Sequence, residues 1–212
     1  MLDTLMYLGA TLQKEAHHGA ELSRRIGLAR KDFDSLSSVW SHAGISRERK
    51  CQIYNACIVS KLLYGVQTIW LNKGDRRRLD AFHCMCLRRC CGILHSYISR
   101  IGNEEVLRVA SDIPLSNRIL GQQLLLFARY AGMPVDALPR RYLFDDDGTL
   151  EPRRWMGPKR RGRPRSDWIK KVYDEALRVV DSDKQLLERL LLDASQARVE
   201  WRSRVCRIMY SV

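Results

Sequence analysis

Four cysteines and a histidine crowd one short stretch of the sequence and could bind a metal ion. They are His83, Cys84, Cys86, Cys90 and Cys91. On a helix, His83, Cys86 and Cys90 would share a face. Structural zinc sites usually take their ligands from two separated pairs, and the sequence holds no second Cys/His pair at such a spacing. We therefore expect these cysteines to be small buried hydrophobes, and we expect no metal ion and no cofactor.

An aromatic residue followed by three acids, Phe144-Asp145-Asp146-Asp147, resembles the aromatic-x-Asp-Asp box with which polymerase palms hold two magnesium ions. Such a box needs flanking apolar strands and a further carboxylate on a neighbouring strand. Here the triplet lies between Pro139 and Gly148, so we expect an acidic turn. The Gly-x-Ser-x-Gly and His-Glu-x-x-His motifs are absent from the sequence, and Arg163-Pro164 replaces the end of a phosphate loop. We expect no catalytic residues in this chain.

Positive charge is concentrated between Arg153 and Lys171, where nine Lys and Arg accompany a single acid. Within the Arg-Gly-Arg-Pro sequence of residues 161–164, glycine permits close backbone approach, proline keeps the chain extended, and the arginines can follow a narrow groove. The segment therefore resembles an AT-hook. The alternative is a basic loop that touches only phosphates or stays solvated. The side chains expected to contact nucleic acid are Lys159, Arg160, Arg161, Arg163, Arg165, Lys170 and Lys171.

The composition favours a polyanionic partner. The 212 residues include 37 Lys and Arg against 24 Asp and Glu, a formal charge of +13. Nucleic acid, RNA or DNA, is the expected partner, and we expect no small-molecule substrate. No uncharged apolar stretch reaches the roughly 18 residues of a membrane span. The odd number of cysteines and the lack of a signal-peptide pattern favour an intracellular location, in the nucleus or cytoplasm.

Helical periodicity dominates the sequence and predicts an all-α fold. A first helix should bury one face, formed by Leu22, Ile26, Ala29, Phe33, Leu36 and Trp40. Ser46 should cap a second helix that ends near Gly65, with Asp75 opening a third that ends at Gly92. The inward-facing stripe of the second helix should be Ile53, Cys57, Ile58 and Leu62.

Changes in composition along the chain divide it into four parts. The predicted parts are a β-hairpin in residues 1–18, a helical bundle in 19–133, an extended basic linker in 134–166 and a helical hairpin in 167–212. The linker holds five of the six prolines and shows no apolar periodicity. In the final part, Ser166 should cap one helix, and Ser182 with Gln185 should form the capping box of the other.

Several short elements recur in a recognisable order over nearly the whole chain. They are Tyr7-Leu8-Gly9, Leu62-Leu63-Tyr64-Gly65 with Trp70, Leu79, Phe82, Leu87-Arg88, Gly92-Ile93, Asn103-Glu104-Glu105, Met133-Pro134, Leu138-Pro139-Arg140, Arg161-Gly162-Arg163-Pro164 with Trp168, and Arg198 with Trp201-Arg202. In this order and spacing they resemble the C-terminal part of reverse transcriptases from non-LTR, LINE-type retrotransposons.

The resemblance implies that Tyr7, Leu8 and Gly9 belong to a primer grip and that the following helices form a thumb. It also implies that the catalytic palm and the endonuclease lie outside these 212 residues. The expected function is then to grip template–primer or target nucleic acid through basic residues. Two alternatives stay open: a stand-alone helical DNA-binding protein with the AT-hook-like motif, and a decayed copy that seldom folds.

Overall fold

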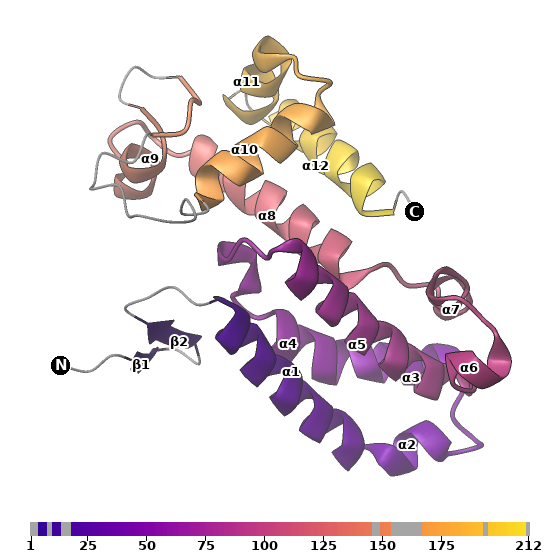
Figure 1. Cartoon of the computed structure of the whole chain (residues 1–212). Helices are drawn as coiled ribbons and strands as arrows, with labels where there is room; N and C mark the ends of the chain where they lie inside the picture. Colours follow the sequence, from indigo (N-terminus) through magenta and orange to yellow (C-terminus); the bar gives the residue numbers. More distant parts are fainter. Residues whose placement is uncertain are drawn as a thin grey trace. The chain divides into compact units, whose positions relative to one another are not determined.

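The structure confirms the expected all-α class (Figure 1). The computed structural model describes residues 4–7, 10–13, 18–145, 149–153, 167–192 and 195–210. At the N-terminus, strands β1 (Thr4–Tyr7) and β2 (Ala10–Gln13) pair in antiparallel register. The chain divides into two compact units between Ile119 and Leu120, and each unit is described separately below.

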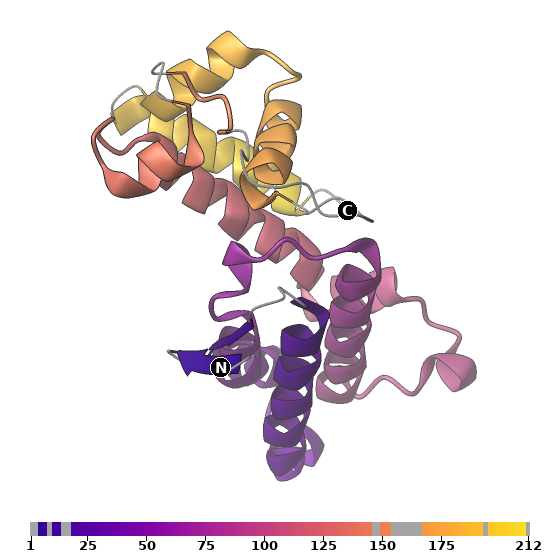
Figure 2. The ribbon, with the colours of Figure 1, turned by 60° about the vertical axis from the view of Figure 1, so that its left-hand side comes forward.

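The first unit is built on two long helices, α1 (His18–Ser35) and α5 (Lys73–Cys91). Arg78 donates a hydrogen bond to Ser23 Oγ near the beginning of both helices, and Arg89 donates one to Asp34 near their ends. The two helices therefore run parallel, and Figure 2 shows them side by side. Around them lie α2 (Ser37–Ser41), α3 (Arg47–Tyr54), α4 (Ser60–Leu63), the 3-10 turn Val66–Thr68, α6 (Ser96–Ser99) and α7 (Asn103–Ala110).

Aromatic side chains form the centre of the first unit's core. Phe33 stacks on Trp40 with ring centroids 4.8 Å apart, and it meets Tyr54 edge-on at 5.8 Å. The predicted single helix carrying Phe33 and Trp40 is broken, because α1 ends at Ser35 and α2 begins after Leu36. Ser35 Oγ donates to the Asp32 carbonyl, and such side-chain bonds to the backbone compete with a regular helix.

Local signals place several helix ends correctly. Ser46 accepts a hydrogen bond from the Arg49 backbone N–H and caps α3, as predicted. Gly92 terminates α5 with a φ of +68°, a conformation that glycine adopts without strain. The predicted start at Asp75 differs slightly, because Asn72 is the capping residue and accepts from the Asp75 backbone N–H.

A π-helical turn, Asn55–Val59, lies between α3 and α4 and changes which residues face inward. Ile58 and Leu62 are buried, but Cys57 is exposed and Ile53 is only half-buried. Tyr54, which is fully buried, faces the core instead. A π-helical turn inserts an extra residue, so a stripe drawn at regular helical spacing loses register when it crosses one.

The second unit begins within α8 (Leu115–Ala131), before the predicted bundle boundary at residue 133. Its helices include α9 (Leu138–Leu143), α10 (Trp168–Val179), α11 (Lys184–Leu192) and α12 (Ser195–Tyr210). Phe127 of α8 packs against Phe144 and Tyr173, with centroids 5.6 and 6.3 Å away. These contacts give the unit its own core. None of the helices in the described ranges is long and apolar enough to cross a bilayer.

Two predictions for this unit need correction. Part of the predicted extended linker 134–166 is folded, because α9 forms with Pro139 in its first turn, where proline needs no N–H partner. Phe144 and Leu150 are then buried. The predicted C-terminal hairpin of two helices is also wrong, because the described residues of this part form three helices, α10, α11 and α12.

The capping residues in this unit are also displaced by one position. Asp167, rather than Ser166, accepts from the Ile169 backbone N–H and caps α10. Asp183, rather than Ser182, accepts from the Leu186 backbone N–H at the start of α11. Ser182 has a φ of +67°, outside the extended conformation that a capping residue adopts.

Candidate nucleic-acid interface

The predicted nucleic-acid-binding residues are only partly within the described structure. Those outside the described residues are Lys159, Arg160, Arg161, Arg163 and Arg165. Lys170 and Lys171 are exposed in the first turn of α10. They extend the basic segment onto a folded helix, so any polyanion held by the segment could also reach this turn.

Of the primer-grip-like residues, only Tyr7 lies within the described structure. Tyr7 is the last residue of β1 and pairs with Ala10 of β2. Leu8 and Gly9 lie outside the described residues. Among the described residues, the two short strands pair antiparallel, as the predicted hairpin requires.

Only the first acid of the Asp145-Asp146-Asp147 triplet lies within the described structure. Asp145 is exposed two positions after the end of α9, whereas Asp146 and Asp147 lie outside the described ranges. The aromatic residue of the motif, Phe144, is buried in the second unit's core. No group of three His, Cys, Asp or Glu side chains suited to a metal ion occurs among the residues that the structure describes.

The cysteine and histidine cluster is buried on α5, as expected. Burial raises the pKa of Cys84 to about 11 and the pKa values of Cys86 and Cys90 to about 12, so these three thiols stay protonated at neutral pH. His83 is fully buried, and its Nδ1 lies 3.0 Å from the Tyr54 hydroxyl. Burial lowers the pKa of His83 to about 4 despite the nearby Asp112.

A cationic surface that the sequence analysis did not single out lies at the beginning of α5. The α5 cationic cluster comprises Lys73, Arg76, Arg77 and Arg78. Lys73 and Arg77 are exposed and form no ion pair with a described residue, whereas Arg78, whose side chain is 53 % exposed, forms an ion pair with Asp75 at 3.6 Å. Four cations thus occupy the first two turns of one helix.

Two acids beside this cluster, Asp75 and Glu21, are buried and already hydrogen-bonded. Asp75 is 6 % exposed and accepts from the side chain of Asn72 as part of the helix cap. Glu21, on the adjacent α1, is 7 % exposed and binds both Arg24 and Arg25. The charge that solvent meets at this end of the first unit is therefore predominantly positive.

An aromatic side chain adds a flat surface beside the cluster. The Arg76 guanidinium lies over the Trp70 ring, 4.5 Å from its centroid. Arg76 Nε also donates to the Leu71 carbonyl, which holds the guanidinium in place. Both side chains are partly exposed. Aromatic and guanidinium planes are the groups on which unpaired bases stack.

The placement of these cations opposes the helix dipole. A helix N-terminus carries partial positive charge, so each cation there is disfavoured by about 0.3–1 kcal/mol, and an anion is favoured. Because α1 and α5 run parallel, their N-termini lie at the same end of the first unit. An anionic partner would relieve the repulsion among the cations and interact favourably with both helix ends.

The sequence does contain a signal for the α5 cationic cluster. The sequence Lys-Gly-Asp-Arg-Arg-Arg at residues 73–78 follows a capping asparagine, so its cations belong to the first turns of a helix. What the sequence could not provide is the position of α1 beside α5 and the burial of Glu21 and Asp75. Those facts decide the sign of the exposed charge.

Several residues that carry the family resemblance stabilise the fold. The buried Arg88 donates to the carbonyls of Leu94 and Ile101 and so holds the chain that follows α5. The buried Arg140 donates to the carbonyls of Ala131 and Met133 at the end of α8. Both arginines therefore satisfy backbone groups rather than facing solvent.

In comparisons with known proteins, no family model, curated protein or solved structure matches this chain.

Proposed function

We propose that the chain binds nucleic acid as the thumb and C-terminal region of a non-LTR retrotransposon reverse transcriptase, and that the polymerase active site lies outside it. The observation that carries the binding proposal is the α5 cationic cluster, whose neighbouring acids are buried. A nucleic-acid backbone suits this surface because its phosphates are closely spaced and fully charged at neutral pH.

The position of the hairpin is consistent with a thumb. Strand β2 leads into α1, and Gly19 in the first turn of α1 lies beside the Asp75 carboxylate of α5. The chain therefore enters the bundle next to the α5 cationic cluster. If Tyr7, Leu8 and Gly9 hold a primer end, as the resemblance implies, the duplex leaving that end would meet the cluster.

A second candidate is a stand-alone DNA-binding protein that reads the minor groove. The sequence Arg161-Gly162-Arg163-Pro164 favours it, because this arrangement suits a narrow, AT-rich groove. In that case the basic segment would provide sequence preference as well as charge. The thumb proposal requires only backbone contacts, which carry no sequence information.

Competition between duplexes separates the two candidates. Fluorescence anisotropy would follow binding of the full chain to duplexes of equal length: an RNA:DNA hybrid, an AT-rich DNA and a GC-rich DNA. The thumb proposal predicts equal affinities or a preference for the hybrid. A tenfold preference for AT-rich DNA would support minor-groove reading, and no binding to any duplex at 50 mM salt would contradict both candidates.

Nucleotide incorporation tests the location of the active site. On a primed RNA template with magnesium and all four deoxynucleotides, we expect no extension above the level of a protein-free control. The same preparation must bind the template in the anisotropy assay, so that inactivity is not confused with misfolding. Template-dependent extension by these 212 residues would contradict the proposal that the active site lies elsewhere.

A further inference from the structure

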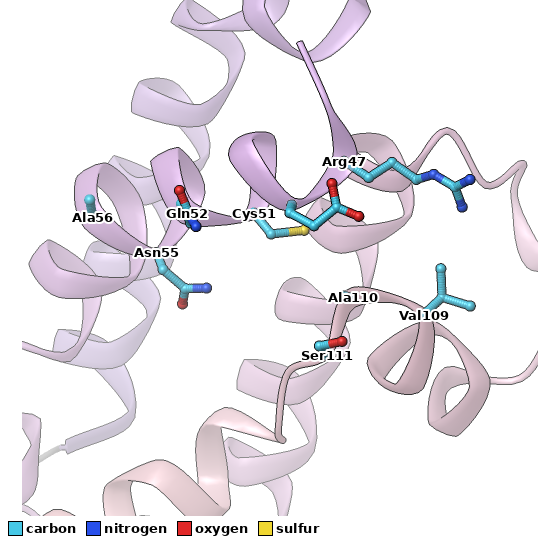
Figure 3. A pocket seen from close by; sticks show the side chains of 9 residues that line it. Arg47, Cys51, Gln52, Asn55, Ala56, Val109, Ala110 and Ser111 are labelled. Carbon is cyan, nitrogen blue, oxygen red and sulfur yellow. The ribbon is translucent and has the colours of Figure 1, made fainter.

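A groove of about 610 Å³ opens between α3 and the end of α7 (Figure 3). Arg47, Gln52 and Cys51 line it from α3, and Val109 and Ser111 line it from α7 and the residue after it. The sulfur of Cys51 points into the groove in Figure 3. The groove therefore connects a largely buried thiol with solvent.

A second thiol, which does not line the groove, lies close to Cys51. Cys91, the last residue of α5, has its Sγ 3.9 Å from that of Cys51. Both residues are nearly buried, at 7 % and 8 % exposure. Closing the two sulfurs to a bond of about 2.05 Å needs a shift of roughly 2 Å.

The pair ionises more readily than the other buried thiols of the molecule. The Cys51 thiol donates to Cys91 and lowers the pKa of Cys91, and the charge of Arg47 lowers it further against the effect of burial. The pKa of Cys51 is raised in return. Of the two sulfurs, that of Cys91 is therefore the one that ionises first.

We propose that Cys51 and Cys91 form a redox-active pair, which hydrogen peroxide converts to a disulfide. The Cys91 thiolate attacks one peroxide oxygen, an S–O bond forms, the O–O bond breaks, and the departing hydroxide takes up a proton to become water. Cys51 then attacks the Cys91 sulfenic acid, an S–S bond forms, and the second oxygen leaves as water. The peroxide is reduced by two electrons and the two thiols are oxidised.

The disulfide would bind α3 to the end of α5. The two cysteines are 40 positions apart in the sequence, so the bond closes a long loop in the unfolded chain. Restricting that loop raises the stability of the folded state. For a unit of this size, we expect the midpoint of thermal unfolding to rise by about 5–15 °C on oxidation and to return on reduction.

Peptide mapping identifies the bond. Trypsin releases residues 51–61 and 90–100, each of which contains two cysteines. The test therefore uses the full chain with Cys57→Ser and Cys90→Ala, treated with hydrogen peroxide and alkylated after unfolding. We expect the two peptides to be joined and two hydrogen atoms lighter than their reduced sum. In the unsubstituted chain, fragmentation of the joined peptides assigns the same bond without any effect of the substitutions on folding.

Matched variants provide the controls. Cys206→Ser removes an exposed thiol on α12 and should leave the cross-link unchanged, while Cys51→Ala should abolish it. Circular dichroism would verify that each variant is folded. The proposal is overturned if peroxide oxidises exposed Cys57 and Cys206 while Cys51 and Cys91 still alkylate, or if the cross-link survives in Cys51→Ala.

Discussion

Two regions of this molecule carry the same net charge in different ways. The basic segment, residues 153–171, contains nine Lys and Arg and one acid, a net charge of +8 over 19 residues. The helical part of the first unit, residues 18–119, contains 17 Lys and Arg and nine acids, also +8. In the segment, the charged residues are neighbours in the sequence. In the helical unit, folding determines which charges face solvent: it buries Glu21 and Asp75 and leaves the α5 cationic cluster exposed.

This difference in how the charge is arranged implies two kinds of nucleic-acid binding, one that needs the folded bundle and one that does not. A basic segment attracts phosphates whatever the state of the remaining chain, because its charge is contiguous. The α5 cationic cluster depends on a folded bundle, which holds its cations in a defined arrangement with Trp70. We therefore expect the segment to contribute more affinity and the cluster to contribute geometry.

The largest effect should follow neutralisation of the segment. We expect Arg160→Ala, Arg161→Ala, Arg163→Ala and Arg165→Ala together to reduce the slope of log affinity against log salt by about 3.6, if each arginine meets one duplex phosphate. Between 50 and 200 mM salt this corresponds to a change of about two orders of magnitude. Anisotropy titrations at four salt concentrations measure this slope. An unchanged slope would show that the segment does not contact the nucleic-acid backbone.

A somewhat smaller effect should follow neutralisation of the cluster. Lys73→Ala, Arg77→Ala and Arg78→Ala together should reduce the same slope by about 2.7. The matched control is Arg189→Ala, Arg202→Ala and Arg207→Ala, three exposed arginines of the second unit. Equal losses from the two triple variants would mean that total charge, rather than the position of the cluster, determines binding.

Acid should weaken the bundle through His83. Its folded pKa of about 4 lies below its ordinary value of 6.5, because burial disfavours the charged form. The unfolded chain therefore takes up a proton that the folded chain rejects as the pH falls through this window. We expect a loss of about 2 kcal/mol in the free energy of unfolding between pH 7 and pH 5.

Denaturant titrations at the two pH values, with His83→Gln as the comparison, measure this loss. The variant should show a flatter dependence on pH because it lacks the titrating ring. An identical pH dependence in both proteins would assign the acid sensitivity to other groups.

Acid should affect binding as well. A destabilised bundle should lose the contribution of the α5 cationic cluster to nucleic-acid affinity before it loses that of the segment.

The smallest effect should come from Trp70. We expect Trp70→Ala to weaken binding to a duplex with a single-stranded overhang by about 1 kcal/mol, roughly fivefold, through loss of a stacking surface. A blunt duplex offers no unpaired base within its length and should bind equally well to both proteins. A loss of equal size with the blunt duplex would indicate that Trp70 acts by positioning Arg76.

Local features of the fold were predictable from the sequence, and features set by packing were not. Ser46 and Gly92 could be placed because a cap and a left-handed residue follow from a few neighbouring positions. The π-helical turn at Asn55–Val59 could not, since it changes register without a local marker. The fold of α9 was hidden by Pro139, which ends most helices but is accepted in a first turn.

The same distinction between local features and features set by packing applies to the candidate site. Lys170 and Lys171 were predicted because their charge adds to a contiguous basic run. The α5 cationic cluster was missed because Asp75 and Glu21 look like compensating charges in the sequence. Their burial, which leaves Lys73 and Arg77 as exposed cations without a described ion partner, depends on α1 and α5 lying side by side.

The central claim is that charge on this chain holds a nucleic-acid backbone, and its most direct test is the salt dependence of the unsubstituted protein. The affinity for an RNA:DNA hybrid would be measured from 50 to 300 mM salt. We predict a straight line of log affinity against log salt with a slope steeper than about −4, as expected for five or more phosphate contacts. A slope near zero would contradict the claim.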